Sequence, residues 1–138
     1  MNKVLKLSDD NESGLTAKDI AAIHYGYCLV NGKVTFTTGL PFDNNIMVEN
    51  ILLMTENKNP VFYWCHVEDF YSYGKGAEGV YHDITMYLPK IYDGESNTTW
   101  ILFDKMELLP QSLTNILCKQ PDLLHELIEK PRSNHKNI

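Results

Sequence analysis

Residues 46–70 (IMVENILLMTENKNPVFYWCHVEDF) contain two apolar, β-compatible runs that are separated by a short polar turn. The first run covers residues 46–55 and the second covers residues 61–70, with Pro60 directly before the second run. Proline is tolerated at the first position of a strand, where its missing N–H is harmless. The stretch therefore predicts an antiparallel pair of strands and, with it, a fold built on a sheet.

Upstream, residues 27–30 and 33–38 are β-prone runs that flank Asn31-Gly32. Asn-Gly is typical of a two-residue hairpin turn in which both residues have positive φ. Before this hairpin, Thr16 and Asp19 have the spacing of a capping box. We therefore predict a helix that begins after Thr16 and ends at Gly26, followed by a second hairpin.

Downstream, residues 71–79 are rich in glycine and are expected to form a long loop. Residues 80–88 alternate between two faces with period two, which predicts a strand. Residues 98–109 also begin as a strand. Apolar stripes over residues 113–117 and 123–128 predict two helices near the C-terminal end.

These elements predict an α+β fold: a small, mostly antiparallel, β-barrel-like sheet of about six strands, flanked by an N-terminal helix and two C-terminal helices. A length of 138 residues fits one domain over residues 1–138. Its core is expected over about residues 15–130. Residues 1–12 and 131–138 are expected to be flexible.

The composition excludes several classes of protein. The chain carries 12 Lys plus Arg against 18 Asp plus Glu, and Arg132 is its one arginine. Arginine is the side chain best suited to phosphates and guanine edges, so sequence-specific binding of duplex DNA is disfavoured. The three cysteines form no Cys-x-x-Cys pair, and no apolar run reaches the length of a membrane span. We expect a cytoplasmic protein with reduced thiols, no metal and no cofactor.

Three stretches occur in the order seen in a known group of small β-barrels: Lys33–Gly39, Ile46–Phe70 and Thr99–Asp104. In this order of elements, which lies within residues 27–104, the chain resembles the PUA-like superfamily, which includes the EVE, YTH and ASCH domains. The resemblance implies a small barrel that binds a modified or flipped base, or an RNA.

Aromatic residues are the most conspicuous resource for binding, with two Trp, eight Tyr and five Phe in the chain. Bases that are flipped or single-stranded stack on such rings. The predicted ligand-binding residues are Phe36, Trp64, Tyr71, Tyr73 and Trp100. Strands also use aromatic residues to fill a core, so either role fits the pattern. Our first hypothesis is a PUA-like, non-enzymatic module that accommodates a base or short nucleic acid.

Acidic residues carry the alternative hypothesis. The carboxylates between residues 68 and 107 are Glu68, Asp69, Glu78, Asp83, Asp93, Glu95, Asp104 and Glu107. Such a belt either solvates the surface or meets a basic protein partner. In the second case the protein is an inhibitor of the immunity or phage-antagonist type, and Asp83, Asp93 and Glu95 are its partner-binding residues.

A catalytic or metal site is the third interpretation. His66 and Glu68 lie two apart on one strand face, and His82 is their cross-strand neighbour if residues 61–70 and 80–88 pair. Two histidines and a carboxylate can bind a metal or move protons. The spacing matches no zinc-hydrolase or deaminase signature, so we predict no enzymatic activity.

Overall fold

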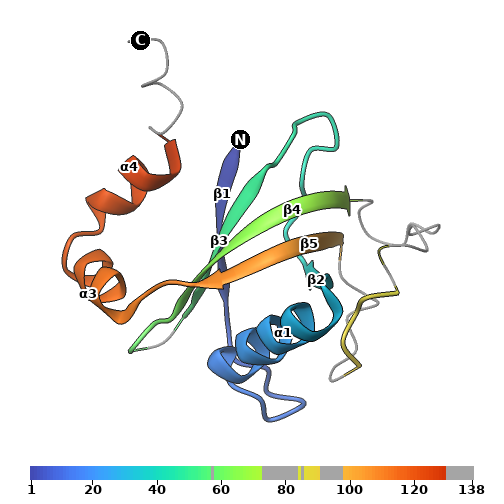
Figure 1. Ribbon diagram of the computed structural model, residues 1–138, viewed down its shortest axis with the longest axis horizontal. Coiled ribbons are helices and arrows are strands. Elements are labelled where there is room, and N and C mark those ends of the chain that lie inside the picture. Colours follow the sequence, from blue (N-terminus) through green and yellow to red (C-terminus); the bar gives the residue numbers. More distant parts are fainter. Residues whose placement is uncertain (57, 73–83, 85, 91–97, 130–138) are drawn as a thin grey trace.

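In the part of the chain that it describes, the computed structural model contains one mixed sheet of five strands, in the order β1-β3-β4-β5-β2, and three helices with defined bounds (Figure 1). The strands are β1 (Asn2–Leu7), β2 (Val34–Thr38), β3 (Asn50–Thr55), β4 (Phe62–Ser72) and β5 (Thr99–Leu108). The helices are α1 (Ala17–Asn31), α3 (Gln111–Lys119) and α4 (Asp122–Glu129). The structure describes residues 1–56, 58–72, 84, 86–90 and 98–129. This half-barrel confirms the predicted α+β class, with one early helix and two C-terminal helices.

The predicted hairpin in residues 46–70 is confirmed. Strands β3 and β4 pair antiparallel, with Leu53 opposite Tyr63, and β4 then pairs antiparallel with the long strand β5. The sheet is mixed because β1 pairs parallel with β3, and Leu5 of β1 is only 3% exposed. The expected flexibility of residues 1–12 is therefore wrong for residues 2–7, which complete one edge of the sheet.

Two neighbouring bulges curve the sheet. The pairing of β4 with β5 shifts between His66 and Val67 and again between Val67 and Asp69. The first shift leaves Asp104 as the extra residue of β5, and the second leaves Glu68 as the extra residue of β4. Bulges of this kind bend a strand and increase its twist. They account for the half-barrel shape and place two charged residues where the ladder is interrupted.

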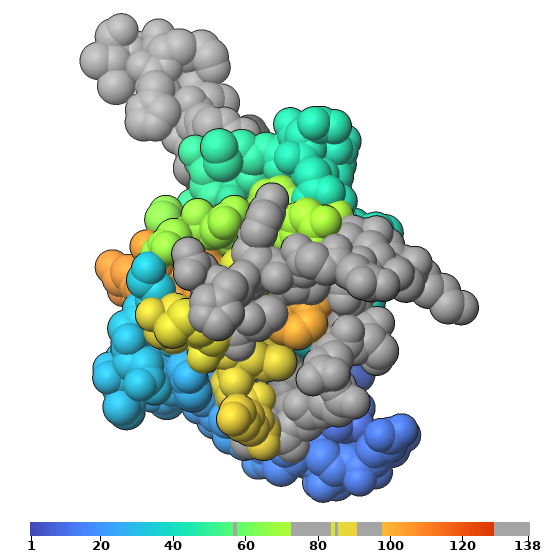
Figure 2. Space-filling model, turned by 90° about the vertical axis from the view of Figure 1, so that its right-hand side faces the viewer, coloured from blue at the N-terminus to red at the C-terminus, as the bar shows by residue number. Residues whose placement is uncertain are grey.

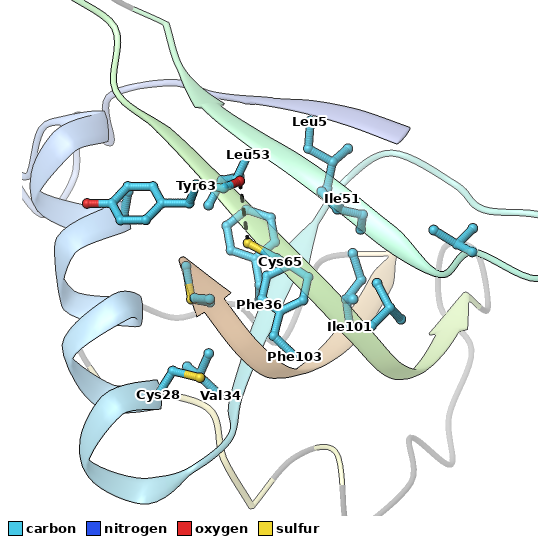
Figure 3. Packing of buried hydrophobic residues seen from close by; sticks show 14 of the residues in the cluster. Leu5, Cys28, Val34, Phe36, Ile51, Leu53, Tyr63, Cys65, Ile101 and Phe103 are labelled. Atoms are coloured by element: carbon cyan, nitrogen blue, oxygen red, sulfur yellow. Dashed lines mark hydrogen bonds between the residues drawn. The ribbon is translucent and has the colours of Figure 1, made fainter. Parts of the chain in front are cut away.

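The concave side of the sheet, here called the inner face, packs against α1. Figure 3 shows residues of this cluster converging from the sheet and α1: Leu5, Cys28, Val34, Phe36, Ile51, Leu53, Tyr63, Cys65, Ile101 and Phe103. Phe36 and Phe103 stack at its centre, with ring centroids 6.1 Å apart. Helix α1 adds Ala21, His24 and Cys28, which lie on one side of the helix because they are spaced at 3–4 residues.

The opposite side of the sheet, here called the outer face, is covered in two separate places. Helices α3 and α4 cover Leu52, Phe62 and Trp64 through apolar side chains such as Leu117 and Ile128. At the other end, Ile84 packs on a second cluster that contains Trp100 and Leu102. Both faces of β4 and β5 are therefore part of a core.

The predicted hairpin at Asn31-Gly32 is wrong, because α1 continues through Gly26 to Asn31. The capping box of Thr16 and Asp19 is present at the start of the helix. Gly32 ends it with φ of +83°, and its N–H donates to the Cys28 carbonyl over 2.8 Å. A helix C-terminus and a hairpin turn both require a left-handed residue, so Asn-Gly fits either structure.

Two glycines of α1 give a matched pair of predictions with opposite signs. Gly32→Ala is expected to lower the free energy of unfolding by about 1 kcal/mol, because its positive φ is strained for alanine. Gly26→Ala is expected to raise it by about 0.5–1 kcal/mol, because this position is inside the helix. An added Cβ meets no neighbouring side chain or distant backbone within 4 Å at either site, so the two changes in unfolding free energy reflect backbone conformation and not packing. Urea unfolding of both variants checks this, and equal shifts would contradict the assigned helix end.

The predicted strand over residues 80–88 is wrong where the structure describes it. Ile84 is helical and residues 86–88 form a turn and a coil, while residues 80–83 and 85 lie outside the described residues. The segment covers the edge of β2, since the Thr35 N–H donates to the Tyr87 carbonyl and the Thr35 hydroxyl donates to the Ile84 carbonyl. Figure 2 faces this side and shows residues 86–90 in yellow at the surface.

Candidate functional site

The four predicted aromatic residues that the structure describes lie in three different places. Phe36 is 3% exposed on the inner face, where it packs with His24 and Phe103, so it presents no ring to a ligand. Trp100 is 4% exposed and belongs to the outer cluster that Tyr71 also contacts. Tyr73 lies outside the described residues. Trp64 lines a pocket.

Trp64 forms a wall of an apolar pocket of about 180 Å³ between the outer face and the C-terminal helices. The other walls come from Leu52, Leu109, Leu113, Leu127 and Ile128. An apolar cavity of about 150 Å³ is enough to hold a benzene ring. The pocket at Trp64 therefore has room for a single aromatic ring, and the half-buried indole supplies a surface on which that ring can stack.

A row of polar residues begins beside this pocket; we call it the polar strip, and its members are Lys33, Asn50, His66, Glu68 and Asp104. His66 lies two residues beyond Trp64 on the same side of β4, which corresponds to about 7 Å along the strand. Asn50 lies opposite His66 on β3, as Leu52 lies opposite Trp64. The strip thus separates the two apolar clusters of the outer face.

Two short polar contacts organise the strip. The His66 Nδ1 atom lies 2.6 Å from Asp104 Oδ1, and the Lys33 ammonium donates to Glu68 over 2.8 Å. The hydrogen bond to Glu68 is the main cause of a raised pKa of Lys33. All four side chains remain 35–52% exposed, so they are open to a ligand as well as to each other. The two bulges bring these partners into contact, because Glu68 and Asp104 are the inserted residues.

The proposed grouping of His66, Glu68 and His82 is not formed by strand pairing. Strand β4 already lies between β3 and β5, and the Val67 N–H donates to the Glu49 carbonyl on its remaining side. His82 itself lies outside the described residues. His66 pairs with Asp104 instead. Within the described part of the chain, no three His, Cys, Asp or Glu side chains are placed to hold a metal ion.

The described carboxylates of the acidic belt are engaged by neighbouring groups. Glu68 pairs with Lys33, Glu107 lies 3.7 Å from Lys105, and Asp104 bonds to His66. Asp69 accepts a hydrogen bond from the backbone N–H of Phe70. The belt on β4 and β5 is therefore a mixed surface of both charges. The three residues predicted to bind a partner, Asp83, Asp93 and Glu95, lie outside the described residues.

The cysteines are unpaired. Cys28 and Cys65 are buried in the inner core, whereas Cys118 of α3 is exposed. Burial raises the pKa of both core thiols, most strongly that of Cys65, which keeps them protonated. In the described part of the chain no helix is long and apolar enough to cross a membrane.

Sequence reasoning missed part of the site. It placed Asp104 in the acidic belt but did not pair it with His66, because a bulge in a strand shifts the register by one residue. It also assigned Leu113, Leu127 and Ile128 to helix faces without relating those faces to Trp64. The excess of apolar residues on both faces of residues 62–65 was the available signal that a second layer covers the sheet.

The fold and site together define an α+β half-barrel with a one-ring apolar pocket beside a charged strip on its outer face. Comparisons of the chain with family models, with curated proteins and with solved structures give no match.

Proposed function

We propose that this protein is a non-enzymatic binding module that accepts one unpaired base of a short nucleic acid in the pocket at Trp64. The observation that supports the proposal most is the position of a ring-sized apolar pocket directly beside polar side chains on the same strand face. A base has an apolar face that stacks and a polar edge that needs hydrogen-bond partners, and both kinds of surface are available here.

The polar strip supplies partners of both kinds for the edge of the base. Asp104 and Glu68 carry acceptors for exocyclic amino groups, while Asn50 can both donate and accept. Asn50 is held in place by a hydrogen bond from its amide nitrogen to Asn2, over 3.2 Å. An apolar pocket with polar groups beside it on the same face distinguishes a heterocycle from a plain apolar side chain.

The alternative, an acidic inhibitor of a basic protein, has less support from the described residues. Its carboxylates on β4 and β5 are already paired with Lys33, Lys105 and His66. A surface that attracts a basic partner over distance needs an excess of one sign. The binding experiment below includes this alternative as an outcome.

The test is the binding of labelled single-stranded DNA and RNA, measured by fluorescence anisotropy. Trp64→Leu keeps an apolar wall in the pocket but removes the stacking surface, so affinity is expected to fall about 5- to 100-fold, since stacking contributes about 1–3 kcal/mol per base. Asp104→Asn is expected to weaken binding too, because it removes the charge that orients His66.

Glu12→Gln is the matched control for Asp104→Asn, because Glu12 is an exposed carboxylate in the turn between β1 and α1, outside the pocket and the polar strip. Its affinity is expected to equal that of the unmodified protein. Thermal unfolding of each variant separates loss of binding from loss of fold. If the unmodified protein retains no nucleic acid but captures a basic protein, the proposal is wrong and the inhibitor hypothesis takes its place.

A further inference from the structure

A second pocket, of about 420 Å³, lies at the end of the β3–β4 turn, between α3 and the first turn of α1. In Figure 1, α3 and the β3–β4 turn lie at the left of the molecule, and the first turn of α1 lies to their right. The polar side chains that line this pocket include Lys18, Lys58, Asn59, Gln111, Asn115 and Lys119. Its volume is within the range of about 300–1,000 Å³ that is typical of small-molecule sites.

The charge of this pocket is opposite to that of the protein. The chain has a formal net charge of −6, yet three lysines and no described carboxylate line this pocket. The three lysines come from α1, the β3–β4 turn and α3, so folding brings together charges that are 40 and 61 residues apart in the sequence. Within the described part of the chain, none of the three ammonium groups forms an ion pair.

Neutral hydrogen-bond donors complete the lining. The Gln111 side-chain amide donates to the Asn115 Oδ1 atom over 2.9 Å, which fixes the orientation of the Asn115 amide. The N–H groups of the Asn115 side chain take no part in this bond. Asn59 and the exposed Cys118 also line the pocket. An anion held by several ammonium groups gains further hydrogen bonds from such amides.

We infer that this pocket binds a phosphate group, carried either by a free phosphorylated small molecule or by the end of a nucleic acid. Each lysine supplies a compact positive charge with three donors, which is a common way to hold phosphate oxygens. The pocket is larger than one phosphate group requires, so it also has room for the molecule that carries the group. The inference does not depend on the pocket at Trp64, which lies on the other side of α3.

The test is a calorimetric titration at low salt with pyrophosphate, a nucleoside monophosphate, and an oligonucleotide with or without a 5′-phosphate. We expect binding that weakens as salt increases. Lys58→Gln combined with Lys119→Gln is expected to reduce the affinity at least tenfold. Tighter binding of the 5′-phosphorylated oligonucleotide than of the small molecules identifies a nucleic-acid end as the source of the phosphate. Binding of pyrophosphate or the nucleoside monophosphate at least as tight as that of the oligonucleotide identifies a free phosphorylated small molecule.

The matched control combines Lys90→Gln with Lys105→Gln, which removes the same charge from exposed positions outside the pocket. Its affinity is expected to stay within twofold of that of the unmodified protein. The single variant Lys18→Gln provides a second test if the double variant unfolds. Absence of binding to every phosphate probe, or an equal loss in the control, would overturn the inference. Trp64→Leu is expected to leave phosphate binding unchanged. The phosphate site and the base pocket can therefore be rejected independently of each other.

Discussion

Phe103→Ala is expected to lower the free energy of unfolding by about 3–5 kcal/mol, a large part of the total for a domain of this size. Phe103 is fully buried at the centre of the inner face and stacks on Phe36 with an angle of 19° between the ring planes. The side chain belongs to the inner cluster, and its cross-strand neighbours are Val34 of β2 and Val67 of β4, so its removal leaves a cavity within the core. Chemical denaturation with urea measures the change.

Leu108→Ala is the matched control on the same strand. Leu108 is 48% exposed, so its truncation is expected to change the free energy of unfolding by no more than about 0.5 kcal/mol. The contrast tests the packing of β5 rather than its β propensity. A loss below about 1 kcal/mol for Phe103→Ala would mean that the inner core is not centred on this ring.

The second large effect is a loss of stability in mild acid that originates from His24. This side chain is fully buried on α1, its Nδ1 atom lies 2.7 Å from the Ile20 carbonyl, and its ring meets Phe36 edge-on with centroids 5.3 Å apart. Burial lowers the pKa of His24 to about 4, against a smaller opposite effect of the hydrogen bond to Ile20. The folded protein therefore holds this imidazole in its neutral form at neutral pH.

The sign of the effect follows from the two protonation states. In the unfolded chain His24 binds a proton near its ordinary pKa of 6.5, whereas in the folded chain its pKa is about 4. Between these values the unfolded state holds more protons, so the free energy of unfolding falls as the pH decreases. At about 1.4 kcal/mol per pKa unit, the contribution of His24 lost between pH 7 and pH 4 is about 3 kcal/mol.

His24→Gln isolates this contribution, because the amide can still donate to the Ile20 carbonyl but has no charge to gain. The free-energy difference between the unmodified protein and this variant is expected to shift by about 3 kcal/mol between pH 7 and pH 4, in favour of the variant at low pH. Urea unfolding of both proteins at pH 7 and at pH 4 measures this difference. Parallel profiles for His24→Gln and the unmodified protein would contradict the burial of His24.

The sequence predicted the elements whose signals are local and have one meaning. The two apolar runs around Pro60 became β3 and β4, and the apolar stripes near the C-terminal end became α3 and α4. The hairpin predicted at Asn31-Gly32 was wrong, because a left-handed glycine ends a helix as readily as it forms a hairpin turn. The choice between the two depends on whether Cys28 and His24 find a core to pack against, and that information is not local.

The candidate site was less predictable than the fold. The sequence predicted Trp64 as a ligand-binding residue, but it predicted Phe36 and Trp100 for the same reason, and these two aromatic side chains are buried in the core. Their roles differ through the layer that covers them, which depends on how α3 and α4 return to the sheet. The pairing of His66 with Asp104 depends on two bulges, and a one-residue insertion in a ladder leaves no clear periodic signature.

The most direct test of a base-binding outer face is a ¹H–¹⁵N chemical-shift titration with a short single-stranded oligonucleotide. The predicted result is a set of perturbed signals that includes the indole N–H of Trp64 and the backbone amides of His66 and Asp104, while amides around Phe36 on the inner face stay unchanged. The same titration with Trp64→Leu should lose these perturbations. Perturbations confined to the lysine-lined pocket, or none at saturating oligonucleotide, would contradict the assignment of the Trp64 pocket as a site for a base.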